Sequence, residues 1–324
     1  MNAVGRIFVS YRRADDPFGA GLVAAVLRDR FGEDGVFLDT WVLNRRGNPE
    51  SGLCQGLDGS AVVLALIGRR WEARLGARDP GATATERDWV AWELREAAGR
   101  ALPVIPVFLR RSPLLGTGVP DDLSRILPRE TAVAVRQGSL RSDTERLVEM
   151  VAAHSGGAVP PQSAAGVTLS EELDPGTVAI GVDAMLRHVV PVPQQRMRNR
   201  QLLVTTCATV LGRQDWLRHV SAGASPGRPA GSGIVVATEG TVTVANLDER
   251  FAVVDRPSVT LGRGPDDLES VDVRRRKRLL VRPVADLRLN RRNGTHLDVR
   301  GLFAGAADDL LDNLPASVAV RSDG

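Results

Sequence analysis

Short apolar runs alternate with amphipathic stretches along the first 154 residues. The apolar runs predict strands at residues 6–10, 35–39, 61–68, 102–109 and 131–135. The amphipathic stretches predict helices at residues 19–31, 49–57, 84–100, 121–127 and 142–154. Strands and helices that alternate in this way form a parallel sheet covered on both faces, and ligands bind beyond the carboxyl ends of its strands. The residues that follow each strand are therefore the candidates for a site.

The pattern changes in the second half of the chain. A small, polar, proline-bearing stretch over residues 155–172 is typical of a linker. Beyond it, runs rich in valine, threonine and leucine predict strands at residues 200–212, 232–246, 250–262, 277–290 and 295–301, and a closing helix at 303–314. We expect an α/β domain over residues 1–154 and a β-rich α+β domain over residues 173–324.

Composition narrows the class of protein. The chain is 43% hydrophobic and 25% charged, as in ordinary globular proteins, and its 324 residues are enough for two domains. A net charge of +3 gives no case for a dedicated nucleic-acid binder. Two scattered cysteines and four scattered histidines form neither a disulfide framework nor a metal-ligand spacing. These features favour a reducing cytoplasm.

No targeting or membrane segment is expected. The first strand begins almost at the start of the chain and leaves no room for a signal peptide. The longest apolar run, residues 61–67, is far too short to span a bilayer. Both observations agree with the cytoplasmic location.

Polar residues follow the first predicted strand. The stretch "FVSYRRADD" places Ser10, Tyr11, Arg12 and Arg13 at the strand's carboxyl end. Cationic groups there suit an anionic ligand such as a dinucleotide pyrophosphate. Neither a G-x-G-x-x-G nor a Walker A sequence is present, so neither familiar phosphate-binding loop applies. The alternative is that the two arginines merely pair with Asp15 and Asp16.

The predicted helix "ATERDWVAWELREAAGR" has its own start signal and apolar stripe. Thr85 and Asp88 resemble a capping box. The buried stripe is expected to consist of Val90, Leu94, Ala97 and Ala101.

Glu93 lies on the flank of that stripe and differs from the other acids of the helix. Glu96 has Arg100 four residues later, the spacing of a helical ion pair. Glu93 has no opposite charge at such a spacing, and Trp89 precedes it by one turn. A partly buried carboxylate without a local partner is a candidate functional group, although a distant part of the chain could also neutralise it.

Several ordered motifs together resemble the Toll/interleukin-1 receptor (TIR) domains of bacteria. They are "IFVSYRRADD", "GVFLDT", "LNRRG", "VLALIGRRW", "DWVAWELREA" and "ALPVIPVFL", over roughly residues 4–152. The W-x-x-x-E spacing from Trp89 to Glu93 is similar to the segment that carries the family's glutamate. The resemblance implies a flavodoxin-like fold with a parallel five-stranded sheet.

The resemblance also implies an activity, because many bacterial TIR domains cleave NAD+ into nicotinamide and ADP-ribose or a cyclised isomer. Glu93 would be the catalytic carboxylate, and NAD+ would be a substrate, with no metal and no cofactor. Substrate contacts would come from Ser10, Tyr11, Arg12, Asp39, Trp71 and Trp89. Two of these have simpler alternatives, since Asp39 could only cap a loop and Trp71 could only pack.

TIR domains often act in assemblies, so the resemblance implies a homo-oligomer formed through the TIR domains. The loop after Asp39, "TWVLNRRGNPESGLCQG", departs from the family pattern in its extra glycines and its asparagine–arginine cluster. Two functions remain open. The first is an NAD+-consuming effector in antiphage defence, and the second is a non-catalytic adaptor that binds other TIR domains.

The second half carries weaker signals. Its size fits the TIR–STING fusions that respond to cyclic dinucleotides, and "ERFAVVDRPSVTL" resembles a STING segment, but few aromatic residues are present to stack on bases. A pleckstrin-homology-like barrel or an unrecognised fold are the alternatives. A nucleotide second messenger or another ligand is a candidate partner. The run "RRRKR" over residues 274–278 is either a site for a phosphate-rich ligand or anionic surface, or a solvated strand edge.

Overall fold

The structure of the chain is a computed structural model. It describes residues 5–12, 15–38, 49–75, 88–110, 116, 118–155, 167, 169–188, 204, 207, 216–228, 233–248, 252–278 and 281–322. The chain divides into two compact units, Met1–Leu173 and Asp174–Gly324. Each unit is described by itself.

The first unit is built on a five-stranded parallel sheet. Its strands are β1 (Arg6–Ser10), β2 (Val36–Leu38), β3 (Ser60–Ile67), β4 (Val104–Leu109) and β5 (Val133–Val135). Their order in the sheet is β2-β1-β3-β4-β5, and every neighbouring pair is parallel. This order is that of the flavodoxin-like fold which the resemblance implies, and its topological switch point lies between β1 and β3.

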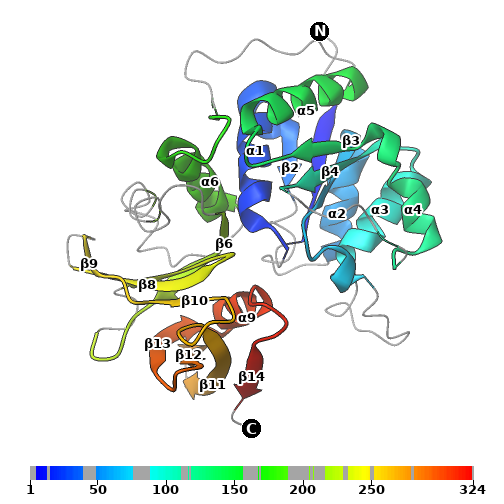
Figure 1. Cartoon of the computed structure of the whole chain (residues 1–324). Helices are drawn as coiled ribbons and strands as arrows, with labels where there is room; N and C mark the ends of the chain where they lie inside the picture. Colours follow the sequence, from blue (N-terminus) through cyan, green and yellow to red (C-terminus); the bar gives the residue numbers. More distant parts are fainter. Residues whose placement is uncertain are drawn as a thin grey trace. The chain divides into compact units, whose positions relative to one another are not determined.

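Helices cover both faces of this sheet, as Figure 1 shows. They are α1 (Pro17–Phe31), α2 (Pro49–Asp58), α3 (Trp89–Gly99), α4 (Asp121–Ile126) and α5 (Leu140–Ser155), with short 3-10 turns η1 (Glu33–Gly35), η2 (Glu72–Arg74) and η3 (Arg129–Thr131). Side chains of α2, α3 and α4 share one apolar cluster with the alternate residues Phe8, Val63, Ala65 and Ile67 of β1 and β3. Helices α1 and α5 contact each other on the opposite face.

Helix α3 differs from its prediction at both ends. The helix begins at Trp89, and Asp88 is its N-cap, because the Asp88 carboxylate accepts a hydrogen bond from the backbone N–H of Ala91 at 3.1 Å. Asp88 is therefore the N-cap residue of α3 and not the third helical residue of a capping box, while Thr85 lies outside the described residues. At the other end, Ala101 is exposed, with φ of 56°, and does not belong to the buried stripe.

The second unit is rich in strands. Its elements are α6 (Pro175–His188), β6 (Leu217–Gly223), β7 (Gly233–Thr238), β8 (Thr241–Leu247), β9 (Val253–Asp255), β10 (Ser258–Thr260), β11 (Leu268–Arg278), β12 (Val281–Arg291), β13 (His296–Phe303), α9 (Ala304–Asp312) and β14 (Ala319–Ser322). One sheet has the order β10-β8-β7-β6, with β9 also pairing β8, and the other has the order β13-β12-β11-β14.

Both sheets enclose one apolar core. Valine and leucine side chains from β7, β8, β11, β12 and β13 meet there, and α9 closes the cluster with Ala307 and Leu310. Single bridges join the sheets at two edges, between Ala224 and Arg300 and between Thr260 and Asp267. Apolar residues thus alternate with polar ones along β11, β12 and β13, which leaves the outer face of that sheet polar.

Some predicted elements of this unit are wrong or missing. In the strand predicted at residues 200–212, the structure describes only Val204 and Cys207, and both are helical and buried. Strand β6 was not predicted because its buried positions include the polar residues Arg218, His219 and Ser221, which hide the alternation. Neither α6 nor β14 was predicted. Among the described residues, no helix is long and apolar enough to cross a membrane.

Candidate active site

Glu93 and Ser10 meet at the carboxyl end of β1. The hydroxyl group of Ser10 donates a hydrogen bond to Oε2 of Glu93 at 2.5 Å, and the exposed fraction of both residues is 0%. Ser10 is the last residue of β1, and Glu93 lies in the second turn of α3. The sequence predicts a partly buried Glu93, whereas the structure buries it completely. Its hydrogen-bond donor lies 83 residues away in the sequence.

The packing of α3 explains why Glu93 reaches β1. Val90, Leu94 and Ala97 turn one side of α3 onto the sheet, and Glu93 sits beside Leu94 on the edge of that side. Removing a carboxylate from water is unfavourable unless protein groups donate hydrogen bonds to it. The Ser10 hydroxyl supplies one such donor. The fold thus holds a carboxylate and a hydroxyl group together at the switch point, where ligands of such sheets bind.

Arg12 lies two residues beyond β1 and is fixed by two groups. Its guanidinium donates to Asp88 at 2.6 Å and lies 5.3 Å from the centroid of the Trp71 ring. Its side chain is only 11% exposed, so the exposed cation that the sequence suggests is instead partly buried. The prediction that Arg12 pairs with Asp15 or Asp16 is also wrong, because its partner is the N-cap residue of α3. Arg13 lies outside the described residues.

Asp15 and Asp16 have structural tasks of their own. The Asp15 carboxylate accepts hydrogen bonds from the backbone N–H groups of Gly68 and Arg70, at 2.7 and 2.8 Å, and so ties the loop after β1 to the loop after β3. A Cβ atom on Gly68 would lie 2.6 Å from that carboxylate, so a larger residue there would force the Asp15 carboxylate to shift. The Asp16 carboxylate accepts from the N–H of Gly19 and caps α1.

The aromatic residues near the site are mostly covered. Trp71 is 0% exposed and Tyr11 is 6% exposed, so Trp71 packs in the core while its ring supports Arg12. Trp89 and Trp92 contact each other edge to face, with ring centroids 5.8 Å apart, and both pack against the same apolar cluster. Asp39 lies outside the described residues.

The structure therefore brings four predicted site residues into two pairs: Ser10 contacts Glu93, and Arg12 contacts Trp71. The sequence assigned Asp88 to a capping box and Asp15 to a local ion pair, and it did not predict the roles that the two residues have here. A signal for Asp88 was available, because an aspartate directly before a helical pattern is a common N-cap. No sequence signal points to Asp15, whose partners are backbone groups more than 50 residues away.

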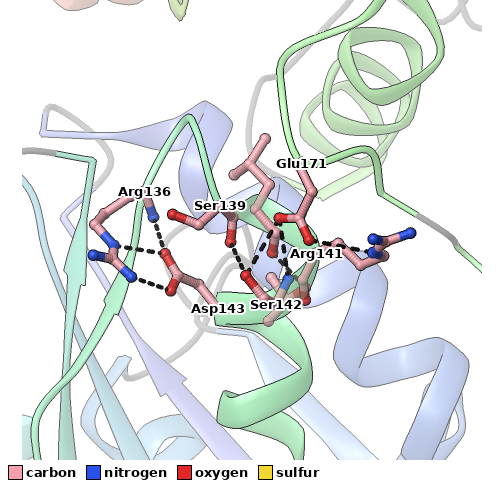
Figure 2. A network of polar contacts seen from close by, with 8 residues as sticks. Arg136, Ser139, Arg141, Ser142, Asp143 and Glu171 are labelled. Atoms are coloured by element: carbon pink, nitrogen blue, oxygen red, sulfur yellow. Dashed lines mark hydrogen bonds and ion pairs between the residues drawn. The ribbon is translucent and has the colours of Figure 1, made fainter.

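A separate polar network lies at the carboxyl end of β5, shown in Figure 2. Asp143, in the first turn of α5, accepts hydrogen bonds from the backbone N–H and the guanidinium of Arg136. This carboxylate raises the pKa of Arg136, mainly through its hydrogen bond to the guanidinium. Glu171 binds the same helix terminus, since its carbonyl accepts from the N–H of Leu140 and its carboxylate accepts from Ser142. The network fixes the start of α5 and the segment around Glu171, so we interpret it as structural.

No group of three or more metal-ligating side chains occurs among the residues that the structure describes. No curated protein matches the chain. Residues 7–137, which contain β2 to β5 and all of β1 except Arg6, match the family model of the TIR domain. The N-terminal part of this chain is therefore a TIR domain.

Proposed function

We propose that the TIR domain cleaves NAD+ once copies of the chain have assembled, with Glu93 as the catalytic carboxylate. The observation that carries this proposal is the position of Glu93, which a hydroxyl group from β1 holds at the switch point of the sheet. The products are nicotinamide and ADP-ribose, or a cyclised isomer. NAD+ is the substrate, and the reaction as proposed uses no metal or separate cofactor.

One carboxylate is enough for this chemistry. Nicotinamide in NAD+ is a cationic leaving group, so it departs with the electrons of its bond to the ribose C1′ and needs no acid. The ribose develops oxocarbenium character, and a carboxylate beside it stabilises the growing positive charge. Water then adds to C1′ and loses a proton, or a nucleophilic atom of the same molecule closes a ring. The Ser10 hydroxyl positions the Glu93 carboxylate in this scheme.

Arg12 is suited to the pyrophosphate of the same substrate. Asp88 and the Trp71 ring hold its guanidinium at the end of β1. The buried Nε of Arg12 has no hydrogen-bond partner within the described part of the chain, so one donor remains for an anion once a rearrangement uncovers it. Arg12 at the phosphates and Glu93 at the nicotinamide ribose would place the bond to be broken near the carboxylate.

The complete burial of Glu93 implies a conformational step. A carboxylate that is 0% exposed cannot touch a substrate, so NAD+ must gain access through a rearrangement around α3. We propose that assembly through the TIR domains favours the open form. Only a difference in binding between the two forms can shift such an equilibrium, and contacts between TIR domains would supply it.

The same burial supports the second candidate function, a non-catalytic adaptor. In that case the Ser10–Glu93 pair only fixes α3 against β1, and the domain acts by binding other TIR domains. The two candidates differ in one respect that can be measured, namely whether Glu93 is needed for the loss of NAD+.

The test measures NAD+ consumption by the full chain and by Glu93→Gln. Each protein is measured alone and after fusion to a tetramer-forming coiled coil, which forces assembly. Glu96→Gln is the matched control, because it removes a charge from the same helix where Glu96 pairs with Arg100 near the surface. We expect wild type and Glu96→Gln to consume NAD+ in the assembled form, and Glu93→Gln to be slower by about 10²- to 10³-fold. Equal rates for wild type and Glu93→Gln, or no consumption by any assembled protein, would favour the adaptor.

We further propose that this activity serves antiphage defence in the cytoplasm, with the second unit as sensor or assembly module. Support comes from the TIR family and from the presence of a second compact unit. The check is the survival of phage-challenged bacterial cells that express wild type or Glu93→Gln at equal levels. Protection by wild type alone is expected, and equal protection by both proteins contradicts an NAD+-dependent role.

A further inference from the structure

The outer face of β11, β12 and β13 carries an ordered set of charges. The strand register places Asp272 opposite Arg288, and Arg288 opposite Asp298, so that the three residues form one row across the sheet. Arg274 lies opposite Asp286 in the next row. The neighbouring residues Val273, Leu287 and Val299 point into the apolar core, which commits the charged side chains beside them to the other face.

The second row is positively charged because its single carboxylate is surrounded by arginines. Asp286 pairs with Arg276 at 2.5 Å and accepts the backbone N–H of Gly301 at 2.9 Å. Arg300 is the residue before Gly301, and its own backbone forms two hydrogen bonds with Ala224 where β13 meets β6. Three arginines, Arg274, Arg276 and Arg300, therefore accompany a single aspartate in this part of the sheet.

The arginines on this face differ in whether their guanidinium groups are paired with a carboxylate. Arg276 is paired with Asp286, and Arg288 is paired with Asp298 at 2.8 Å. In contrast, the side chains of Arg274 and Arg300 form no hydrogen bond or ion pair with any residue that the structure describes. The field of Arg300 does reach the first row, since it helps Arg288 to lower the pKa of Asp298. Unused guanidinium donors next to a locally positive charge favour an anion.

These side chains line a hollow of about 370 Å³. Its lining includes three arginines and three aspartates, namely Arg274, Arg276, Arg300, Asp272, Asp286 and Asp298. A volume of this size suits a small molecule rather than a polymer. The two rows also differ in charge. Arginines dominate the row of Arg274 and Asp286, whereas in the other row two aspartates flank the single arginine, Arg288.

We propose that this hollow binds a small phosphorylated molecule that also carries hydroxyl groups, such as a sugar phosphate or a mononucleotide. Arg274 and Arg300 bind the phosphate group, with Arg276 adding to the positive charge. Asp272 and Asp298 accept hydrogen bonds from the hydroxyl groups. The site lies wholly in the second unit, and the proposal does not depend on NAD+ cleavage by the first.

The test measures the binding of inorganic pyrophosphate and of ribose 5-phosphate to the full chain by isothermal titration calorimetry. Ionic strength is held constant, because salt screens charges on an open face. We expect saturable binding of both probes by wild type. The double variant Arg274→Gln/Arg300→Gln is expected to weaken the binding of both probes at least tenfold. Neither arginine has a partner in the described chain, so the melting temperature should stay near that of wild type.

A double variant with the same loss of charge is the control. Arg256→Gln/Arg263→Gln removes two exposed arginines that do not line the hollow. It should bind both probes as wild type does. The proposal is overturned if wild type shows no saturable binding, if Arg274→Gln/Arg300→Gln binds as wild type does, or if both double variants lose affinity equally, which would indicate a diffuse effect of net charge.

The variant Asp272→Asn tests the proposed role of the aspartates separately from that of the arginines. It should weaken the binding of ribose 5-phosphate relative to pyrophosphate, because only the sugar offers hydroxyl groups to the carboxylate. If the affinities for both probes change by the same factor, the aspartates do not accept hydrogen bonds from the hydroxyl groups, and the assignment of a hydroxylated ligand is wrong.

Discussion

The carboxyl edge of the TIR sheet and the outer face of β11 to β13 both hold arginines and carboxylates, but in opposite ways. At the TIR edge the charges are covered, with Glu93 at 0% and Arg12 at 11% exposure. On the outer face of the second unit they remain exposed, with Arg288 at 52% and Arg276 at 43%. The first arrangement is fixed by tertiary contacts, whereas the second is fixed by the register of antiparallel strands.

This difference follows from the two kinds of sheet. A parallel sheet is buried on both faces, so its polar residues gather where the strands end, and α3 then covers them. An antiparallel sheet can leave one face in water, so charged residues occupy alternate positions along whole strands. Substitutions should therefore affect stability strongly at the TIR edge and weakly on the open face.

The largest effect is expected at Arg12. Arg12→Ala removes the partner of Asp88, which is 17% exposed, and the cation above Trp71. Leaving such a carboxylate unpaired should lower the free energy of unfolding by about 3–5 kcal/mol. Urea denaturation followed by tryptophan fluorescence measures this change. Arg125→Ala, at an exposed position of α4, is the control and should shift the midpoint little. Equal shifts in the two variants would contradict the contrast between covered and open charges.

Ser10→Ala should have the next largest effect. The change removes the hydroxyl donor of a fully buried carboxylate, which should lower the free energy of unfolding by about 1–3 kcal/mol. Ser142→Ala, which removes an exposed hydroxyl group from α5, serves as the reference. The same urea titration checks both variants. A loss in Ser142→Ala as large as that in Ser10→Ala would show that burial of the bond is not the cause.

A buried histidine in the second unit tests whether the effect of a polar residue on stability depends on its burial or on the unit in which it lies. Burial lowers the pKa of His219 to about 3, and its Nε2 lies 2.8 Å from the hydroxyl oxygen of Ser221. The unfolded chain binds a proton near pH 6.5, so the folded form loses stability as the pH falls from about 6.5 towards 3, by about 1.4 kcal/mol per pH unit.

Thermal unfolding of wild type and His219→Gln between pH 7.5 and pH 4.5 measures this effect. The wild-type melting temperature should fall more steeply below pH 6.5 than that of the variant. Parallel curves for the two proteins would show that His219 is not the group responsible.

The smallest effect on stability is expected on the open face. Arg274→Gln/Arg300→Gln should change the free energy of unfolding by no more than about 0.5 kcal/mol per site, because neither side chain forms a contact that the fold needs. The urea midpoint in the absence of phosphate measures it. A loss comparable to that of Arg12→Ala would remove the distinction between the two regions.

The sequence predicts the TIR sheet well because each strand is a short apolar run between clear breaks. It predicts the Glu96–Arg100 ion pair for the same local reason, and the structure confirms it at 2.9 Å. The complete burial of Glu93 could not be predicted, because it depends on how α3 packs on the sheet, where the carboxylate meets Ser10, 83 residues away. The partner of Arg12 is 76 residues away, and the sequence offered the nearer aspartates instead.

In the second unit, β7, β8 and β13 follow the apolar alternation and were predicted, whereas β6 buries arginine and histidine and was not. Helix α6 does have a start signal, since Asp174 accepts a hydrogen bond from the N–H of Thr177 and Pro175 begins the helix. Its interior was not recognised, because glycines interrupt the apolar stripe. Which residues line the hollow depends on the strand register, which the spacing of apolar residues alone does not determine.

Catalysis by Glu93 is tested most directly by the release of nicotinamide from NAD+ by the assembled chain, followed by NMR in wild type, Glu93→Gln and Glu96→Gln. We expect steady release by wild type and Glu96→Gln, and a rate about 10²- to 10³-fold lower for Glu93→Gln. Release by Glu93→Gln at the wild-type rate would show that the carboxylate beside Ser10 is not catalytic.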